Sequence, residues 1–229
     1  MNTGRNLISW LLLGLLTVLA LGAAALGIVQ APKNAPLISC ASPQQPIQHC
    51  TGAVPNTLAA ANYSQVLSED TPQGKQTDYL VYQAPDRLGG YIQSGSKRTY
   101  VYVIGKFEYQ SLTVANNAST NHLVLYRQPS QGAQALDPAH GYLPYAKSAK
   151  DVQQSGDTYS FTLSETTSQG KETGTFAYTV SGSYVSEFTL NVAGSSVQLI
   201  ISQVGSSPPV SIPAGAKIVG VTGGSTTGG

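Results

Sequence analysis

Four segments in the second half of this 229-residue chain alternate between apolar and polar residues. A period of two places all the large apolar side chains of a strand on one face of its sheet. Short stretches rich in Gly and Ser, typical of hairpin turns, separate several of these segments. The pattern therefore predicts an antiparallel meander with one apolar face and one polar face. The segments are Tyr159–Leu163, Thr175–Val180, Phe188–Val192 and Val197–Ile201.

The first half of the chain contains six further candidates for strands, which are rich in β-branched and aromatic residues. One of them, from Tyr100 to Ile104, is apolar on both faces, so we expect it to be central in the sheet or covered by another segment. The six candidates are Tyr63–Glu69, Thr77–Gln83, Tyr91–Gln93, Thr99–Ile104, Lys106–Val114 and His122–Arg127.

Two helices are predicted to cover the apolar face, because a single sheet with one apolar side needs a second layer. The longer one is expected over Tyr142–Gln154, and Asn56 is expected to cap a short one that runs from Leu58 to Ala61. In the longer helix, apolar residues recur every three positions and mark one stripe, formed by Leu143, Ala146, Ala149 and Val152.

An uninterrupted apolar run of 23 residues without a charge extends from Leu7 to Val29. A helix of that length spans about 34 Å, enough to cross a hydrocarbon core of roughly 30 Å. Residues 1–29 are therefore expected to be an uncleaved signal-anchor, which makes the chain a single-pass protein of the cell membrane with an extracytoplasmic C-terminal domain. Two alternatives stay open: a cleaved signal peptide, and lipidation of Cys40 in the lipobox-like segment Leu37–Cys40.

Residues 30–55 are predicted to be a Pro-rich linker that carries the only two cysteines. An exported chain meets an oxidising compartment, where thiols at this spacing are expected to form a disulfide between Cys40 and Cys50. A zinc site with His49 is disfavoured, because adjacent His49 and Cys50 do not easily point at one ion and a fourth ligand is missing. Residues 56–221 are expected to form one β domain, and residues 222–229 a disordered Gly/Ser/Thr tail.

Composition and motifs exclude several classes of function. Only 10% of the residues are charged and the net charge is +1, so the chain has no basic patch for nucleic acid. It lacks the G-x-S-x-G, H-E-x-x-H, P-loop and G-x-G-x-x-G motifs. The three histidines, His49, His122 and His140, are scattered. The protein is therefore predicted not to be an enzyme and to need no cofactor or metal.

Five pieces of sequence within residues 56–220 occur in a recognisable order: Tyr82–Arg87, Tyr142–Val152, Ser155–Phe161, Tyr184–Phe188 and Val204–Pro213. In order and spacing they resemble the LolA/LppX-like (LppX/LprG-type) lipoprotein and lipid carriers, especially their actinobacterial exported branch. The resemblance implies a mainly β (α+β) fold, with a strongly curved antiparallel sheet that forms a half-open barrel and one or two helices on its concave side. It also implies a cavity that binds acyl chains. The apolar segment and the displaced Cys40 depart from the usual pattern of that family.

The apolar face of the meander is the candidate ligand site. A curved sheet presents a wider apolar face than one or two short helices fill, and the remainder is either a packed core or a cavity for an apolar ligand. Arg87 is the candidate to meet an anionic headgroup, and the alternative is that it pairs with Asp86 or a backbone carbonyl. The candidate cavity residues are Tyr159, Phe161, Leu163, Phe176, Tyr178, Val180, Phe188, Leu190, Val192, Val197, Leu199 and Ile201.

The leading hypothesis for function is a membrane-tethered extracytoplasmic protein that binds a lipid or the acyl chains of a lipoprotein, as a carrier or chaperone. One alternative is a cell-envelope sensor or regulatory domain. That role needs an envelope protein partner, because Met1–Asn6 is too short to signal alone. The other alternative is a structural β domain that has a filled core and no ligand.

Overall fold

The computed structural model describes residues 47–72, 74–149, 152–167, 170–192 and 194–220. The predicted membrane segment, the lipobox-like segment and the C-terminal tail lie outside these residues. No helix within the described ranges is long and apolar enough to cross a membrane.

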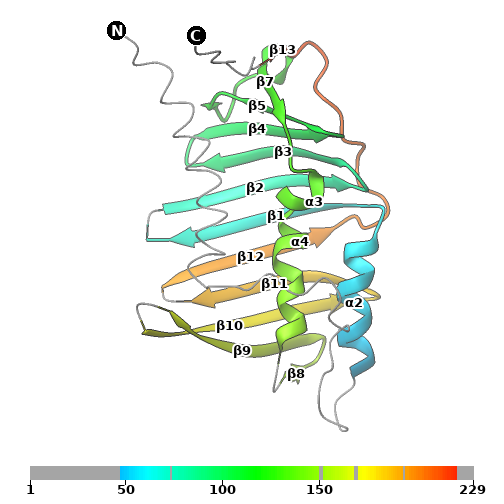
Figure 1. Ribbon diagram of the computed structural model, residues 1–229, viewed down its shortest axis with the longest axis vertical. Helices are drawn as coiled ribbons and strands as arrows, with labels where there is room; N and C mark the ends of the chain where they lie inside the picture. The colour runs from blue at the N-terminus through cyan, green and yellow to red at the C-terminus, as the bar shows by residue number, and fades with distance from the viewer. Residues whose placement is uncertain (1–46, 73, 150–151, 168–169, 193, 221–229) are drawn as a thin grey trace, which may run out of the picture.

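Within these described residues, thirteen strands form one large, curved and open sheet (Figure 1). The strand order along its main path is β13-β7-β5-β4-β3-β2-β1-β12-β11-β10-β9-β8, with β6 paired to β4. All pairs are antiparallel except β13 with β7. The mainly β, antiparallel prediction is thus confirmed, apart from this one parallel pair at an edge. The strands are β1 (Asn62–Thr71), β2 (Gly74–Gln83), β3 (Arg87–Ser94), β4 (Lys97–Ile104), β5 (Phe107–Ser111), β6 (Val114–Ala115), β7 (Val124–Pro129), β8 (Gln153–Ser155), β9 (Thr158–Thr167), β10 (Gly170–Ser181), β11 (Tyr184–Val192), β12 (Ser195–Ser202) and β13 (Lys217–Gly220).

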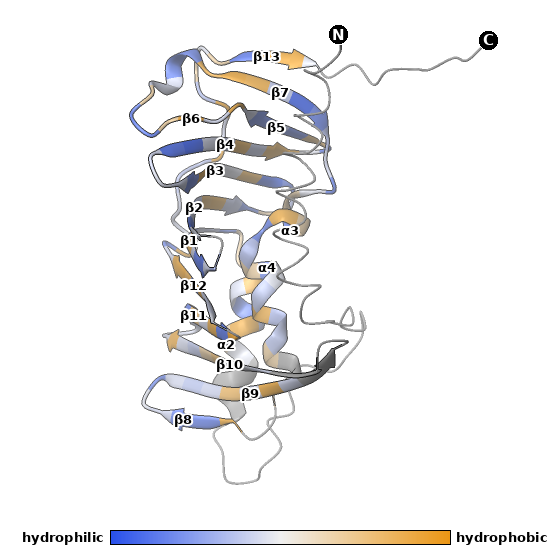
Figure 2. Cartoon of the chain, turned by 90° about the vertical axis from the view of Figure 1, so that its left-hand side faces the viewer, coloured by the Kyte–Doolittle hydropathy of each residue, from blue (hydrophilic) through white to orange (hydrophobic). Residues whose placement is uncertain are grey.

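The α-helices lie on one side of the sheet, which we call the inner face (Figure 2). Helix α2 packs mainly against β11, whereas the following short helices run across the middle of the face. A further 3₁₀ turn, η1 (Thr120–His122), precedes β7. The helices of the inner face are α2 (Ile47–Ala59), α3 (Ala133–Leu136), α4 (Pro138–Tyr142) and the 3₁₀ helix η2 (Leu143–Ser148).

The sheet has a hydrophobic core on each side. The larger one lies between the inner face and the helices. The smaller one, on the outer face, contains Tyr100, Tyr102 and Leu125, and Ile212 from the connection between β12 and β13 packs against it. Val101 and Val103 alternate with these tyrosines along β4 and so face inward, and Val103 is fully buried in the inner core. The prediction that this strand is covered on both faces is therefore confirmed.

The predicted helix over Tyr142–Gln154 is wrong in its type and its end. The chain instead forms α4, continues as η2 to Ser148, and enters β8 at Gln153. A repeat of three residues is the period of a 3₁₀ helix, in which positions i and i+3 lie one above the other. All four residues of the predicted stripe are nevertheless buried in the inner core, as the apolar pattern requires.

The first helix is longer than predicted. It begins at Ile47 and contains Pro55, so residues 47–55, which the sequence assigned to the linker, are helical. Asn56 does not cap this helix; its side-chain amide donates to the carbonyl of Ser183 at 3.1 Å, in the turn between β10 and β11. The sequence pattern also missed the short elements α3, β8 and β13.

Candidate functional site

The twelve candidate cavity residues project from one face of β9, β10, β11 and β12. In the register of these strands, Phe176 lies directly opposite both Phe161 and Leu190, and Leu190 lies opposite Val197. All twelve belong to the inner core or pack against it. Leu163, Val192 and Val197 are half-buried, and the other nine residues are buried. The predicted shared face is therefore present.

Aromatic rings form a continuous layer over this face. Phe161 and Phe176 stack with their ring centroids 5.1 Å apart, and Tyr159 and Tyr178 do so at 5.3 Å. Phe176 also contacts Phe188, at 6.2 Å. Ring pairs in these arrangements contribute roughly 0.5–1.5 kcal/mol beyond the burial of their area. The layer is therefore a continuous apolar surface that spans β9, β10 and β11.

Two tyrosines of the helical layer rest on these rings. Tyr142, the last residue of α4, stacks on Phe188 with ring centroids 5.7 Å apart. Tyr145 in η2 lies 5.6 Å from Phe176, at an angle of 50° between the ring planes. The short helices therefore cover the middle of the apolar face.

A polar cluster attaches this helical layer to β1. Asp137, which caps α4, is buried and accepts hydrogen bonds from the hydroxyl of Tyr63 at 2.6 Å, from the side-chain amide of Gln65, and from the backbone N–H of His140 at 3.0 Å. The imidazole of His140 also contacts the same carboxylate. Burial, and then the charge of Asp137, raise the pKa of Tyr63 far above its usual range, so its hydroxyl stays a donor.

A second polar cluster lies further along the inner face. The hydroxyl of Tyr142 donates to Glu69 Oε1 at 3.0 Å, and the side-chain amide of Gln76 donates to Asp78 Oδ1 at 3.0 Å. Burial raises the pKa of Glu69. Burial, with a smaller contribution from the charge of Glu69, raises the pKa of Asp78 to about 7. Two acidic groups are thus held close together in an apolar setting.

The polar side chains of both clusters are paired within the fold. Every buried side-chain nitrogen or oxygen in the described part of the chain has a hydrogen-bond partner. Among the same residues, no group of three or more His, Cys, Asp or Glu side chains is placed to hold a metal ion. In each cluster, a residue of β1 is hydrogen-bonded to α4 or to its cap, so both clusters attach the helical layer to the sheet. These contacts could not be inferred from the sequence pattern, because the partners are 72 to 74 residues apart.

The structure does not bring Arg87 together with the apolar face. Its neighbour Leu88 is in the inner core, so alternation along β3 places Arg87 on the outer face. There its guanidinium Nη1 donates to the backbone carbonyl of Val210 at 3.1 Å. Arg87 thus makes the contact with a backbone carbonyl that was the predicted alternative to binding an anionic headgroup. The predicted Cys40–Cys50 disulfide stays a prediction, because Cys40 and the side chain of Cys50 lie outside the described residues.

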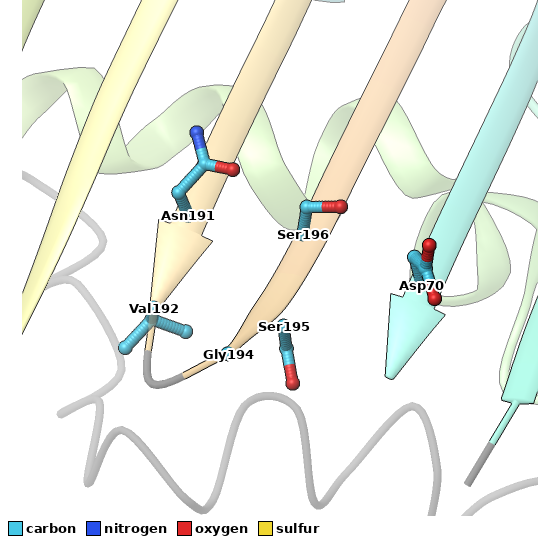
Figure 3. Close-up of a pocket in the computed structure, with 6 residues that line it drawn as sticks. All are labelled: Asp70, Asn191, Val192, Gly194, Ser195 and Ser196. Atoms are coloured by element: carbon cyan, nitrogen blue, oxygen red, sulfur yellow. The ribbon is translucent and has the colours of Figure 1, made fainter. Parts of the chain in front are cut away.

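A pocket with a volume of about 460 Å³ lies where β1 ends and β11 turns into β12 (Figure 3). Its lining is mostly polar and includes one of the candidate residues, Val192. The carboxylate of Asp70 at this pocket is paired with Lys75 at 2.7 Å. The lining residues are Asp70, Asn191, Val192, Gly194, Ser195 and Ser196.

No protein-family model and no curated protein matches the chain. Its structure is similar to that of LprF from Mycobacterium bovis, with 12% sequence identity, coverage of 74% of this chain and 96% of LprF, and a TM-score of 0.45. It is also similar to the lipoprotein LppX from Mycobacterium tuberculosis, with 12% identity, coverage of 73% of this chain and 97% of LppX, and a TM-score of 0.43.

Proposed function

We propose that this protein is a non-enzymatic, membrane-tethered lipid- or lipoprotein-binding protein of the carrier or chaperone type. Its ligand would be an acyl chain held against the inner face of β9–β12, in a cavity of half-barrel form between the sheet and the short helices. The apolar residues 7–29 would anchor the chain in the cell membrane, with the β domain on the extracytoplasmic side.

One observation carries the proposal: a broad aromatic face is covered by very short helical segments. The helices α3, α4 and η2 have four, five and six residues. Segments of this length are marginal by themselves and depend on tertiary contacts. At the margin of the cover, Leu163, Val192 and Val197 remain half-buried, so part of the apolar face is not filled by the helices. Each methylene group that a ligand buries there contributes about 0.8 kcal/mol.

The test is the lipid content of the purified full-length protein. After extraction from membranes in a non-lipid amphipol, organic extracts analysed by mass spectrometry are expected to contain an acyl lipid in near-stoichiometric amount. Val197→Trp should lower that amount, because it fills the margin of the inner face. Ile200→Trp is the matched control, since Ile200 lies on the same strand but is exposed on the outer face. Protein free of lipid that also fails to react with photoactivatable acyl probes would overturn the proposal.

A ligand-free structural domain is the second candidate, and the stacking of Tyr142 and Tyr145 on the aromatic layer favours it. In that case the helices simply complete a dry core. The same experiment distinguishes the two candidates. A structural domain carries no lipid, and added acyl compounds do not change its free energy of unfolding.

A further inference from the structure

The inner face of β9–β12 is closed at one end of its strands. There α2 packs against β11, and Thr57 on α2 is fully buried. Its hydroxyl accepts a hydrogen bond from the backbone N–H of Val185 at 2.9 Å and donates to the carbonyl of Ala53 at 2.7 Å. Val185 itself is fully buried. We call this the α2 end.

The opposite end of the same strands is more open. We call it the hairpin end, because β1, β9 and β11 end there and β2, β10 and β12 begin there (Figure 1). The three half-buried candidates meet at this end: Gly174 lies opposite both Leu163 and Val192, while Val197 lies two residues after the start of β12. The pocket beside Val192 is also at this end (Figure 3), but Asp70, Asn191 and Ser196 alternate with inner-face residues, so half of its lining belongs to the outer face. Among the twelve candidate residues, those that are only half-buried all lie at the hairpin end.

Two carboxyl groups, of Glu69 and Asp78, lie on the inner face toward the hairpin end. Glu69 lies directly opposite Val197, and Gln76 lies opposite Glu69 on the next strand. Asp78 follows on the same face and is 4% exposed. In the described part of the chain, neither carboxyl group forms a salt bridge with Lys or Arg.

From these placements we propose that the acyl ligand enters and leaves at the hairpin end, that its headgroup stays there, and that this headgroup carries no negative charge. The inference rests on the proposed function and adds to it the orientation and the chemical class of the ligand. The chain would run from Val192 and Val197 toward the closed α2 end. Fatty alcohols, acylglycerols and other neutral acyl lipids fit this class.

The reason is electrostatic. An anionic headgroup at this end would be brought beside two acidic groups in surroundings that screen charge poorly, and like charges there repel strongly. Burial, and to a smaller extent the charge of Glu69, raise the pKa of Asp78, so a further negative charge is disfavoured in the same surroundings. Neither a hydroxyl nor an ester group meets such a penalty, since a hydroxyl can donate to a carboxylate and the oxygen of either group can accept from a protonated carboxyl.

The experiment compares two photoactivatable probes on the full-length protein in bilayer nanodiscs at pH 8. Both probes carry the same diazirine-bearing acyl chain, and one ends in a hydroxyl group, the other in a phosphate. Labelled peptides are mapped by mass spectrometry. The alcohol is expected to label the segments around Leu163, Val192 and Val197, at least about tenfold more than the phosphate, which corresponds to about 1.4 kcal/mol of discrimination.

Variants then test the cause of the discrimination. Glu69→Gln combined with Asp78→Asn should raise labelling by the phosphate probe toward that of the alcohol. Glu187→Gln is the matched control and should leave the ratio unchanged, since Glu187 lies on the outer face opposite Ile200. If the double variant does not fold, Val197→Trp provides a second readout: it should suppress labelling by the alcohol at Leu163 and Val192.

The outcomes separate this inference from the proposed function. Equal labelling of the hairpin end by both probes in the native protein overturns the headgroup class but leaves acyl binding in place. Labelling concentrated near Ala53 and Val54 on α2 overturns the orientation. The absence of labelling anywhere on the inner face by either probe overturns the proposed function itself.

Discussion

The hydroxyl of Tyr142 donates a 3.0 Å hydrogen bond to the carboxyl group of Glu69, and the two residues are 73 positions apart in the chain. This contact fixes the end of α4 to β1, at the point where the aromatic ring of Tyr142 also stacks on Phe188. One side chain therefore joins the helical layer to the sheet through both a polar and an apolar contact.

Tyr142→Phe is expected to destabilise the protein while keeping the ring stack. The substitution removes the donor to Glu69 and leaves a carboxyl oxygen that is largely buried, which costs about 1–2 kcal/mol. Urea denaturation followed by circular dichroism measures the change. Tyr184→Phe is the control, because Tyr184 is 38% exposed and should give a change close to zero. Equal stability of Tyr142→Phe and the native protein would show that this hydrogen bond does not hold the helical layer.

The stability of the protein should fall as the pH rises toward neutrality, with Asp78 as one cause. Burial holds the pKa of folded Asp78 at about 7, against 3.8 for the ordinary carboxyl group. The folded state therefore binds more protons than the unfolded state between these values, so the contribution of this group is fully present below about pH 4 and is lost as the pH rises through 7.

Asp78→Asn should remove this part of the pH dependence. The amide cannot ionise and keeps an oxygen that accepts from Gln76. Denaturation at a series of pH values is expected to show a gain of about 2–4 kcal/mol at pH 8 that shrinks toward zero at pH 4. Asp70→Asn is the control, since its exposed pair with Lys75 contributes at most about 1 kcal/mol. A gain that is the same at every pH would contradict this explanation.

Removal of the Asp137 carboxylate should loosen the helical layer. Asp137→Ala leaves Tyr63 and Gln65 without a buried acceptor and deprives α4 of its cap, which together cost about 2–4 kcal/mol. Hydrogen exchange followed by mass spectrometry should show faster exchange in residues 133–146.

Two comparisons make the Asp137 result specific. Asp157→Ala, in the exposed turn between β8 and β9, should leave both stability and exchange unchanged. Asp137→Asn keeps one acceptor oxygen and should lie between the native protein and Asp137→Ala. If hydrogen exchange in residues 133–146 is unchanged in Asp137→Ala, the apolar contacts alone hold the helical layer on the sheet and this polar cluster is not needed.

The strands were predictable from the sequence because their signal is local. Alternation over five or six residues was enough to place Phe161, Phe176, Phe188 and Leu199 on one face, and the register of the sheet confirms it. The apolar stripe that contains Leu143 was also found, but the same residues suit either a 3₁₀ or an α-helix, and tertiary packing decides between them.

The polar contacts of the inner face were not predictable, since they join positions that are distant in sequence. Nothing in the chain near Asp137 indicates that Tyr63 and Gln65 will be its partners, 74 and 72 residues away. For Arg87 the sequence left two possibilities open, a headgroup role and pairing with Asp86 or a backbone carbonyl. The connection after β12 supplies a carbonyl, from Val210, that accepts a hydrogen bond from its guanidinium.

Gly90→Ala should be among the most destabilising single-methyl substitutions in the sheet. Gly90 lies in the middle of β3 with φ at +157°, and a Cβ atom there would be only 1.9 Å from the carbonyl oxygen of Tyr79 on the neighbouring strand. The Cβ atom would clash with the backbone of β2, which cannot turn aside as a side chain can. The clash is removed only if β2 and β3 separate, and that separation breaks hydrogen bonds between the two strands and the stack between Tyr79 and Tyr91.

Thermal unfolding measures this effect against a matched glycine. Gly95→Ala, in the β3–β4 turn, also places alanine at a positive φ, +56°, but meets no atom within 4 Å, so it should cost about 1 kcal/mol. Gly90→Ala is expected to cost several times more, roughly 3 kcal/mol or above, because a backbone clash is added to the unfavourable φ. Similar melting temperatures for the two variants would mean that β2 and β3 can move apart without penalty, and that the register of these strands is looser than the structure indicates.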